Sequence, residues 1–271
     1  QNDAITVTVG TSDYIQADGT FTGSAAAIDV NDAFTLSGGT FISTSGTLSL
    51  AGALTISGTP TFTHNSGTFQ FDTNAATLTP STVIFNNVSF TSAVVKTIAD
   101  SQTMTVAGTL TLTDGSINQT TIPATGSIAA QGNITQASTS DGGSGRIEAT
   151  STANQTFTGT ATQTAGLLPI FEIDKSAGTL TFSGTIRTSN NWTWTAGTLD
   201  AGTSTVVFAG ALTITGSHTL NNVIFNGANV NYTIANSNTL TVAGTLTLNN
   251  GNINQTTIPA TGSIAAQGNI T

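Results

Sequence analysis

The sequence predicts an all-β protein. Charged residues make up 6% of the 271-residue chain, against roughly 25% in ordinary globular proteins. Threonine supplies about a fifth of the residues and recurs with valine, isoleucine and 13 phenylalanines, all of which suit a pleated, half-buried strand. Strong helix formers such as glutamate, lysine, arginine and methionine are scarce. Together with the short motif described next, this composition favours strands along nearly the whole chain.

A short motif with an alternating pattern recurs along the chain. Glycine is followed by a small residue, leucine, threonine or serine, and a second apolar residue, so apolar side chains share one face of a strand and hydroxyls the other. The motif occurs at 46–50, 52–56, 108–112, 178–182, 210–214 and 244–248. Further strands are expected at 33–37, 40–43, 61–64, 68–72 and 203–208. Only a few turn residues separate these strands.

Repetition at a longer scale divides the chain into two units. The segments 104–135 and 240–271 differ at four of 32 positions. Residues 21–23 recur at 157–159, with the same offset along the chain as the two longer segments. A fixed period of this kind is the signature of a repeat architecture. We therefore predict one continuous rod made of two β-solenoid repeat units, residues 1–135 and 136–271.

The frequency of turns favours a solenoid, in which short strands coil into stacked turns that we call rungs. Turn signals come every 6–9 residues, more often than the 8–12 typical of a β-sandwich. Local alignments of the two units shift by about 20 residues in places, which predicts rungs of about 20 residues. Stacked threonines stabilise one another by roughly 0.2–1 kcal/mol per pair, whereas stacked like charges repel. The alternative is two tandem β-sandwich domains of about 135 residues.

The glycine-threonine-leucine strands, the asparagine- and threonine-rich faces and the long tandem units resemble the repetitive regions of large bacterial surface proteins. This group includes filamentous-haemagglutinin-like adhesins and autotransporter passengers. The resemblance is one of pattern and composition, and it covers nearly the whole chain. It implies a right-handed parallel β-helix, an extracellular or cell-surface location, and a role in adhesion or surface structure. It assigns no functional residues.

Charge and hydrophobicity exclude several classes of partner. The formal net charge is −9, with four basic residues, Lys96, Arg146, Lys175 and Arg187. Binding of nucleic acid requires clustered basic side chains to neutralise phosphates, so no nucleic-acid partner is expected. Apolar residues are scattered singly between threonine, serine and glycine, and no run approaches the ~20 residues of a membrane helix. Neither membrane insertion nor a cofactor is expected.

Trp192 and Trp194 form the most distinctive candidate site. They alternate with Thr193 in Asn191-Trp192-Thr193-Trp194 and therefore share one face of a predicted strand. Two aromatic rings side by side offer a platform for stacking a sugar or an anchor for an interface. The alternative is interior packing at a wide rung. A carbohydrate-binding adhesin or a phage fibre segment is the functional hypothesis attached to this pair.

Parallel β-helices also house polysaccharide-degrading enzymes, which need carboxylates that converge on one face. Three small charged spots are candidates: Glu172 with Asp174, Arg146 with Glu148, and Asp29 with Asp32. We expect these side chains to be solvated and to keep the rod soluble, and we predict no catalytic residues.

Metal binding finds equally little support in the sequence. His64 and His218 are isolated, carry no metal-ligand spacing, and are expected at exposed turns. A calcium ion at Asp29 and Asp32, or near Asp141, has little to support it. No metal site is therefore predicted.

The function that the sequence favours is structural. Neither terminus resembles the atypical cap that closes natural solenoids, because residues 5–9 read as a plain strand and the chain stops inside the repeat. We expect a self-assembling filament or a segment of a longer tandem-repeat surface protein. The expected partners are copies of the chain itself or neighbouring repeats, with glycans as a further alternative.

Overall fold

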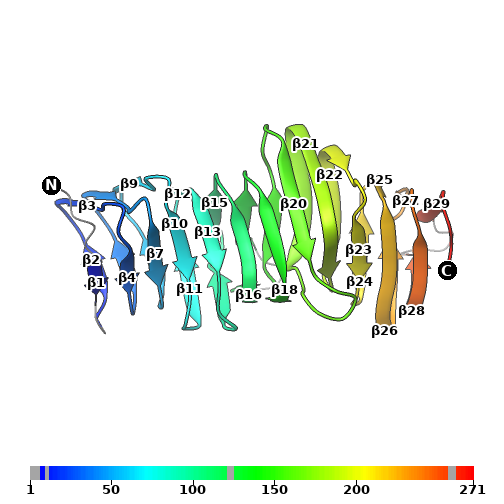
Figure 1. Cartoon of the computed structure of the whole chain (residues 1–271), viewed down its shortest axis with the longest axis horizontal. Helices are drawn as coiled ribbons and strands as arrows, with labels where there is room; N and C mark the ends of the chain where they lie inside the picture. The colour runs from blue at the N-terminus through cyan, green and yellow to red at the C-terminus, as the bar shows by residue number, and fades with distance from the viewer. Residues whose placement is uncertain (1–6, 10–11, 121–124, 256–260) are drawn as a thin grey trace.

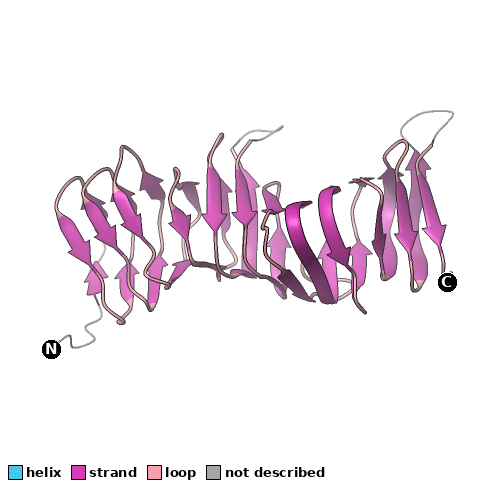
Figure 2. Cartoon of the chain, turned by 90° about the horizontal axis from the view of Figure 1, so that it is seen from above, coloured by secondary structure: helices cyan, strands magenta, loops and turns pink. Residues whose placement is uncertain are grey.

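A computed structural model of the chain describes residues 7–9, 12–120, 125–255 and 261–271. These residues form a parallel β-solenoid of about 12 turns that contains strands and no helices. The molecule is an elongated rod with its two termini at opposite ends (Figure 1), and the successive turns are also visible from above (Figure 2). The predicted all-β solenoid is confirmed, and the alternative of two β-sandwich domains is wrong, because parallel pairing links strands along the whole rod.

In the first half of the rod each rung contributes strands to three columns. The first column contains β1 (Val7–Val9), β4 (Ile28–Val30), β7 (Thr47–Leu50), β10 (Thr68–Phe71), β13 (Asn87–Phe90), β16 (Leu110–Gln119), β18 (Ile134–Gly142) and β20 (Gln155–Thr160). The second contains β2 (Tyr14–Gln16), β5 (Phe34–Leu36), β8 (Leu54–Ile56), β11 (Ala76–Thr79), β14 (Val95–Ile98) and the end of β16. The third contains β3 (Thr20–Thr22), β6 (Thr40–Ile42) and β9 (Thr61–Thr63), then β12 (Ile84–Phe85), β15 (Thr103–Val106), β17 (Ser127–Ala130) and β19 (Arg146–Ala149).

The second half continues this ladder through longer strands. It comprises β21 (Ile170–Thr188), β22 (Trp192–Asp200), β23 (Thr205–Phe208), β24 (Leu212–Thr215), β25 (His218–Leu220), β26 (Asn222–Ile234), β27 (Thr239–Val242), β28 (Leu246–Gln255) and β29 (Ser263–Ala266). The strands β21 and β22 rise above the others in Figure 1. Strand β18 crosses the division between residues 135 and 136, so the ladder is continuous there.

Rung length follows from the residues that lie side by side on neighbouring rungs. Val206 pairs with Val223 across a rung that contains few residues, and Phe157 pairs with Phe182 across a rung that contains many. Most rungs are intermediate between these two, in agreement with the predicted length of about 20. Because parallel strands lie about 4.8 Å apart, the turns add up to a rod roughly 60 Å long.

A continuous apolar core fills the rod and follows from the alternating pattern. In β7, Leu48 and Leu50 are fully buried while Thr47 and Ser49 face outward. The same alternation recurs from Ile28 to Leu246 in one connected cluster. Burial of apolar side chains stabilises by about 25 cal/mol per Å², so this cluster is the main source of stability along the axis.

Asparagine side chains bind neighbouring rungs to one another at one corner. The Oδ1 of Asn87 accepts a hydrogen bond from the backbone N–H of Thr109 at 2.8 Å. The Oδ1 of Asn222 accepts one from Thr245 at 2.9 Å in the same way. Backbone N–H groups that are withdrawn from water require such partners, and these asparagines supply them between neighbouring rungs.

Candidate functional site

Trp192 begins β22, and its side chain fills the interior of the rod. Its relative exposure is 0%, and its ring centroid lies 5.0 Å from Phe171 and 5.8 Å from both Phe182 and Phe208. Contacts of this kind between aromatic rings stabilise beyond the area that they bury. Because Trp192 has no exposed ring face, it belongs to the core. This agrees with the alternative prediction of interior packing.

His218 is the polar partner of Trp192, and the prediction of an exposed turn residue is wrong for it. Its side chain is 8% exposed and lies in β25. Its Nε2 accepts a hydrogen bond from Trp192 Nε1 at 3.1 Å, and its Nδ1 lies 2.8 Å from the carbonyl oxygen of Gly216. The imidazole is therefore neutral with the proton on Nδ1. Burial lowers the pKa of His218, and the hydrogen bond to Gly216 raises it.

Gly216 allows this arrangement because its backbone adopts a left-handed conformation with φ of +86°. A Cβ atom at this position would lie 1.8 Å from the carbonyl oxygen of Trp194. Glycine is the residue that tolerates both conditions. The turn thus brings the carbonyl oxygen of Gly216 to the imidazole of His218.

Trp194 is half-buried and packs against the core. Its ring is stacked on the imidazole of His218, with centroids 6.5 Å apart and planes at 21°. Trp192 and Trp194 therefore share one face of β22, as predicted, and that face points inward. The geometry fits a buried aromatic cluster that joins neighbouring rungs better than a platform for a sugar.

A second cluster brings together charged residues that the sequence leaves apart. On the outer face of β19 and β21, Glu148 and Glu172 lie side by side on neighbouring rungs. Arg146 pairs with both carboxylates, at 2.8 Å from Nε to Glu148 and at 3.3 Å from a terminal nitrogen to Glu172. Thr195 Oγ1 also donates to Glu172 at 2.8 Å. Burial raises the pKa of Glu148, while Arg146 lowers it and Glu172 raises it.

This charged cluster has two of the elements of a glycoside-hydrolysing site, since two carboxylates lie close together and the pKa of one is raised. A cleft for the sugar would be the third. Two hollows of about 500 Å³ lie near the C-terminal end, and neither is lined by Arg146, Glu148 or Glu172. Asp174 lies on the same strand face and is exposed. The arrangement fits an ion-paired patch on the rod surface.

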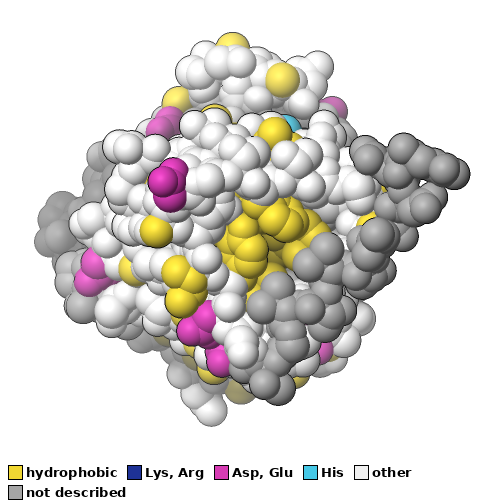
Figure 3. Space-filling view, turned by 90° about the vertical axis from the view of Figure 1, so that its left-hand side faces the viewer, with side chains coloured by type: hydrophobic (Ala, Val, Ile, Leu, Met, Phe, Trp, Pro, Cys, Tyr) yellow, Lys and Arg dark blue, Asp and Glu magenta, His cyan; other side chains and the backbone are white. Residues whose placement is uncertain are grey.

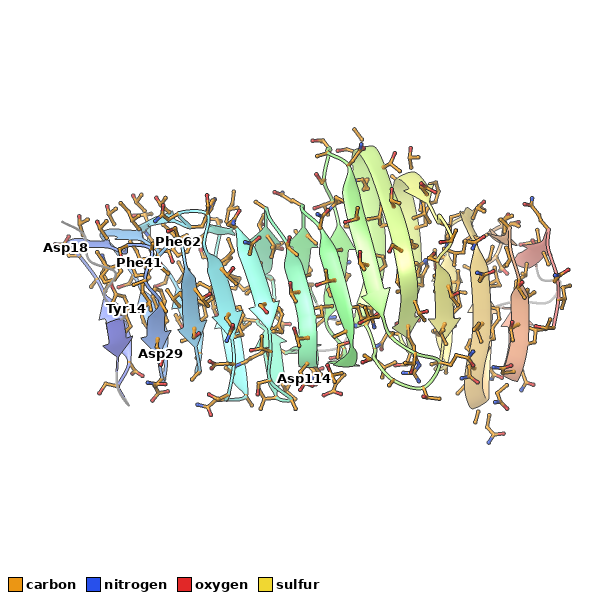
Figure 4. All side chains as sticks on the ribbon, viewed as in Figure 1. Tyr14, Asp18, Asp29, Phe41, Phe62 and Asp114 are labelled. Atoms are coloured by element: carbon orange, nitrogen blue, oxygen red, sulfur yellow. The ribbon has the colours of Figure 1, made fainter. Side chains whose placement is uncertain are left out.

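The acidic residues considered for calcium do not form a cluster. Figure 4 places Asp29 near the N-terminal end of the rod, whereas Asp141 belongs to β18 in its middle part. Among the described residues, no group of three or more histidine, cysteine, aspartate or glutamate side chains gathers as metal ligands do. The suggested calcium sites thus gain no support.

Two buried lysines are features that reasoning from the sequence missed. Lys175 is 1% exposed, and its Nζ donates to the carbonyl oxygens of Ser151 at 3.0 Å and Ala153 at 2.9 Å and to Gln155 Oε1 at 2.7 Å. Three acceptors match the three protons of an ammonium group. Burial lowers the pKa of Lys175. The side chain thus binds its own rung to the preceding one.

Lys96 makes a similar connection in the first unit. It is 2% exposed, and its Nζ donates to the carbonyl oxygens of Ala51, at 3.2 Å, and Asn74. Burial lowers the pKa of Lys96 to about 8, and the charge of Asp72 raises it. A signal for both lysines is present in the sequence, because Lys96 is in phase with Ile98, and Lys175 with Ile173.

The C-terminal end face is formed by β28, β29 and Ile270. Side chains that point along the interior of the rod are uncovered there, with relative exposures of 46% for Leu248, 43% for Ile253 and 63% for Ile270. Ile253, Ile264 and Ile270 help to line a hollow of about 520 Å³. The side chains that line this hollow are mostly apolar.

The N-terminal end face is formed by β1, β2 and β3. Among the described strands each of these pairs on one side only, with β4, β5 and β6 respectively. Apolar side chains occupy the centre of this end and acidic side chains lie around them (Figure 3). The rings of Phe21, Phe41 and Phe62 are stacked in one column, and Phe21 is its outermost described member. Unpaired strand edges are templates for further pairing.

Comparisons with known proteins do not assign the chain to a family. No family model, no curated protein and no solved structure matches it significantly. The described part of the chain contains no helix long and apolar enough to cross a membrane.

Proposed function

We propose that the chain is a structural rod segment of an extracellular or cell-surface protein. In this proposal further rungs continue the rod, either from a neighbouring repeat of a longer chain or from copies of the same chain. The observation that carries the proposal is the parallel ladder of the main sheet and the connected apolar core, which extend through the described rungs. Solenoid repeats contact only their neighbours, so added rungs lengthen a rod without altering its interior.

The surface chemistry supports a structural role over the two alternatives. Trp192 is buried, so the aromatic pair that motivated carbohydrate binding has one ring without access to a ligand. Arg146 pairs with both Glu148 and Glu172, and none of the three lines the hollows of about 500 Å³ near the C-terminal end, so an enzymatic role has no specific support. The resemblance to repetitive bacterial surface proteins supports the proposed location.

The proposal is tested by joining two copies of the chain directly, with Thr271 followed by Gln1, and imaging the product by electron microscopy. Stackable rungs predict one straight rod of about twice the single length, or roughly 120 Å. A matched control carries a flexible glycine-serine linker at the junction and should show two rods at variable angles. The rod proposal fails if the direct fusion bends as freely as the control.

The location requires a separate experiment. Antibodies raised against the purified chain should label intact cells of its source. Labelling that appears only after the cells are permeabilised would contradict a surface location.

A further inference from the structure

We propose that the loop between β20 and β21, residues 161–168, is a strap that binds several successive rungs together from outside and covers an apolar patch on the outer face of the rod. Release of the strap uncovers this patch while the ladder stays paired. The strap starts and ends among internal rungs, so its action does not depend on what continues the rod at either end.

The strap extends along the axis of the rod instead of around it. Its carbonyl oxygen at Gln163 accepts a hydrogen bond from Asn226 Nδ2 at 3.0 Å, and its Gln163 Oε1 accepts one from Asn249 Nδ2 at 3.4 Å. The ladder from the end of β20 to β26 runs through three steps, from Thr160 to Thr185, Thr205 and Asn222. Because rungs lie about 4.8 Å apart, the strap crosses roughly 14 Å of the outer surface. Figure 1 shows it along the lower edge of the rod, below β21 and β22.

Two apolar side chains on the outer face are buried although they do not belong to the core. In β23, Val206 and Phe208 point into the core cluster, so Val207 between them points outward. Ile224 lies beside Val207 on the next rung and alternates in the same way. Neither Val207 nor Ile224 is part of the core cluster, yet their exposures are 0% and 9%. A segment outside the ladder must therefore cover them.

The hydrogen bonds of the strap place it over this pair. Arg187 lies beside Val207 on the preceding rung, and Asn226 lies in β26, two rungs beyond Arg187. Both side chains donate to the same carbonyl oxygen of Gln163, Arg187 from Nε at 3.2 Å and Asn226 from Nδ2 at 3.0 Å. The peptide group at Gln163 therefore lies between these rungs, above Val207. The outward positions that flank the pair, Arg187 and Thr247, are polar, so the apolar patch coincides with the place that the strap crosses.

The tip of the strap is folded on itself and exposed. Thr162 Oγ1 accepts hydrogen bonds from the backbone N–H groups of Thr164, at 3.2 Å, and Ala165, at 2.9 Å, and residues 162–165 are exposed. The rod holds this tip through the side chains of Arg187 and Asn226, and a terminal nitrogen of Arg187 also donates to the next carbonyl group, that of residue 166, at 3.2 Å. Hydrogen bonds of this kind each contribute little net stability, so the tip detaches at low cost.

The two ends of the strap are fixed by the ladder. Ala161 is 6% exposed, and its N–H donates to the carbonyl oxygen of Thr185 at 3.1 Å. Leu168 is fully buried, and its N–H donates to the carbonyl oxygen of Arg187 at 2.9 Å. Between these ends Gly166 turns the chain back with φ of +83°, a conformation that glycine adopts freely. Release therefore moves the tip alone, and the apolar patch beneath it favours closure in water.

The test measures thiol labelling by a maleimide, since the chain contains no cysteine of its own. Val207→Cys places a thiol beneath the strap, and Val206→Cys places a matched control in the core; both positions are 0% exposed. Each reporter is compared with and without the pair Arg187→Met and Asn226→Ala, which removes the bonds to the tip. Without those bonds the thiol at position 207 should react about tenfold faster or more, because several hydrogen bonds are lost from the closed strap. The thiol at position 206 should keep its slow rate.

The comparison of the two positions separates release of the strap from loosening of the whole rod. Equal acceleration at positions 206 and 207 would mean that the ladder itself opens, and it would overturn the strap. An unchanged rate at position 207 would also overturn it, because the bonds from Arg187 and Asn226 would then hold no cover in place. If circular dichroism shows that the double substitution misfolds the chain, Asn226→Ala alone replaces it, with the same two reporters. Neither result bears on the direct fusion of two copies, which tests the rod function separately.

Discussion

The hydrogen bond between Trp192 and His218 predicts that the rod loses stability in mild acid. A protonated His218 would carry a donor on Nε2 and face the N–H of Trp192, so the folded state resists protonation. Burial lowers the pKa of His218 in the folded state, while an unfolded histidine has a pKa near 6.5. Below pH 6.5 the unfolded state therefore binds more protons, and the free energy of unfolding falls as the pH falls. The contribution is fully present above pH 6.5.

The linkage relation limits the size of this effect. One group that binds a proton only in the unfolded state changes the free energy of unfolding by at most about 1.4 kcal/mol per pH unit. Between pH 7.5 and 5.5 the His218 contribution should therefore approach, without exceeding, about 1.4 kcal/mol, because only the last unit lies below 6.5. Burial raises the pKa of Glu148, and that group acts in the opposite direction, so a difference between variants is needed.

Urea unfolding at pH 7.5, 6.5 and 5.5 measures the effect. Tryptophan fluorescence reports on these rungs, because both tryptophans of the chain pack beside His218. The control is His218→Gln, which keeps an acceptor for Trp192 and does not titrate. The variant should lose less stability than the wild type on acidification. Equal losses in both proteins would refute the assignment of a buried neutral histidine.

Three further predictions concern side chains that bind rungs together. Lys96 should make the free energy of unfolding rise by at most about 1.4 kcal/mol per pH unit from pH 8 toward 10.5, because burial lowers its pKa to about 8 and the unfolded state binds more protons in that window. Lys175, whose pKa burial also lowers, acts in the same direction, so Lys96→Met should reduce the rise in urea titrations, and an unchanged rise would contradict the Lys96 assignment. Lys175→Met should destabilise by about 2–4 kcal/mol, because it leaves three acceptors without their buried donor. The exposed neighbour provides the control Ser176→Ala, and equal urea midpoints for the two variants would argue against the ammonium site. Gly216→Ala should lower the thermal midpoint through about 2 kcal/mol or more of backbone strain and collision with Trp194, and an unchanged midpoint would contradict the left-handed turn.

The alternating pattern predicts the fold well because the choice between interior and exterior is local. In β7 the order threonine, leucine, serine, leucine already separates the buried from the exposed residues. The near-identical segments 104–135 and 240–271 likewise predict two equivalent rungs, which the structure contains as β16 with β17 and β28 with β29. Neither inference requires knowing which residues lie side by side on neighbouring rungs.

Contacts between rungs are harder to predict, because they depend on the exact number of residues in each turn. Arg146 meets Glu172 since the local register places Glu148 beside Glu172 on the next rung. Rungs elsewhere, such as the one from Val206 to Val223, are several residues shorter. An error of one residue would place these side chains on opposite faces of the strand. The sequence alone therefore does not predict the ion-paired cluster.

The error on His218 has a different cause. An isolated histidine without metal-ligand spacing suggests an exposed turn only if the alternating pattern of its neighbours is ignored. In β25 the burial alternates, and His218 shares the inward face with Leu220. The buried lysines carry the same signal, because Lys175 is in phase with Phe171 and Ile173. Polar residues that are in phase with buried apolar residues are thus the positions at which such a sequence best indicates a buried polar contact.

Amide hydrogen exchange of β28 tests most directly whether the C-terminal end face is a rung that lacks its neighbour. The peptides 110–119 and 246–255 differ in sequence, so mass spectrometry separates β16 from β28. In the single chain β28 should exchange faster than β16. In the direct fusion of two copies, half of the β28 signal should slow to the rate of β16, because the first copy is then covered. If all of the β28 signal keeps the fast rate in the fusion, the rungs of one copy do not stack on those of the next, and the chain is not a segment of a continuous rod.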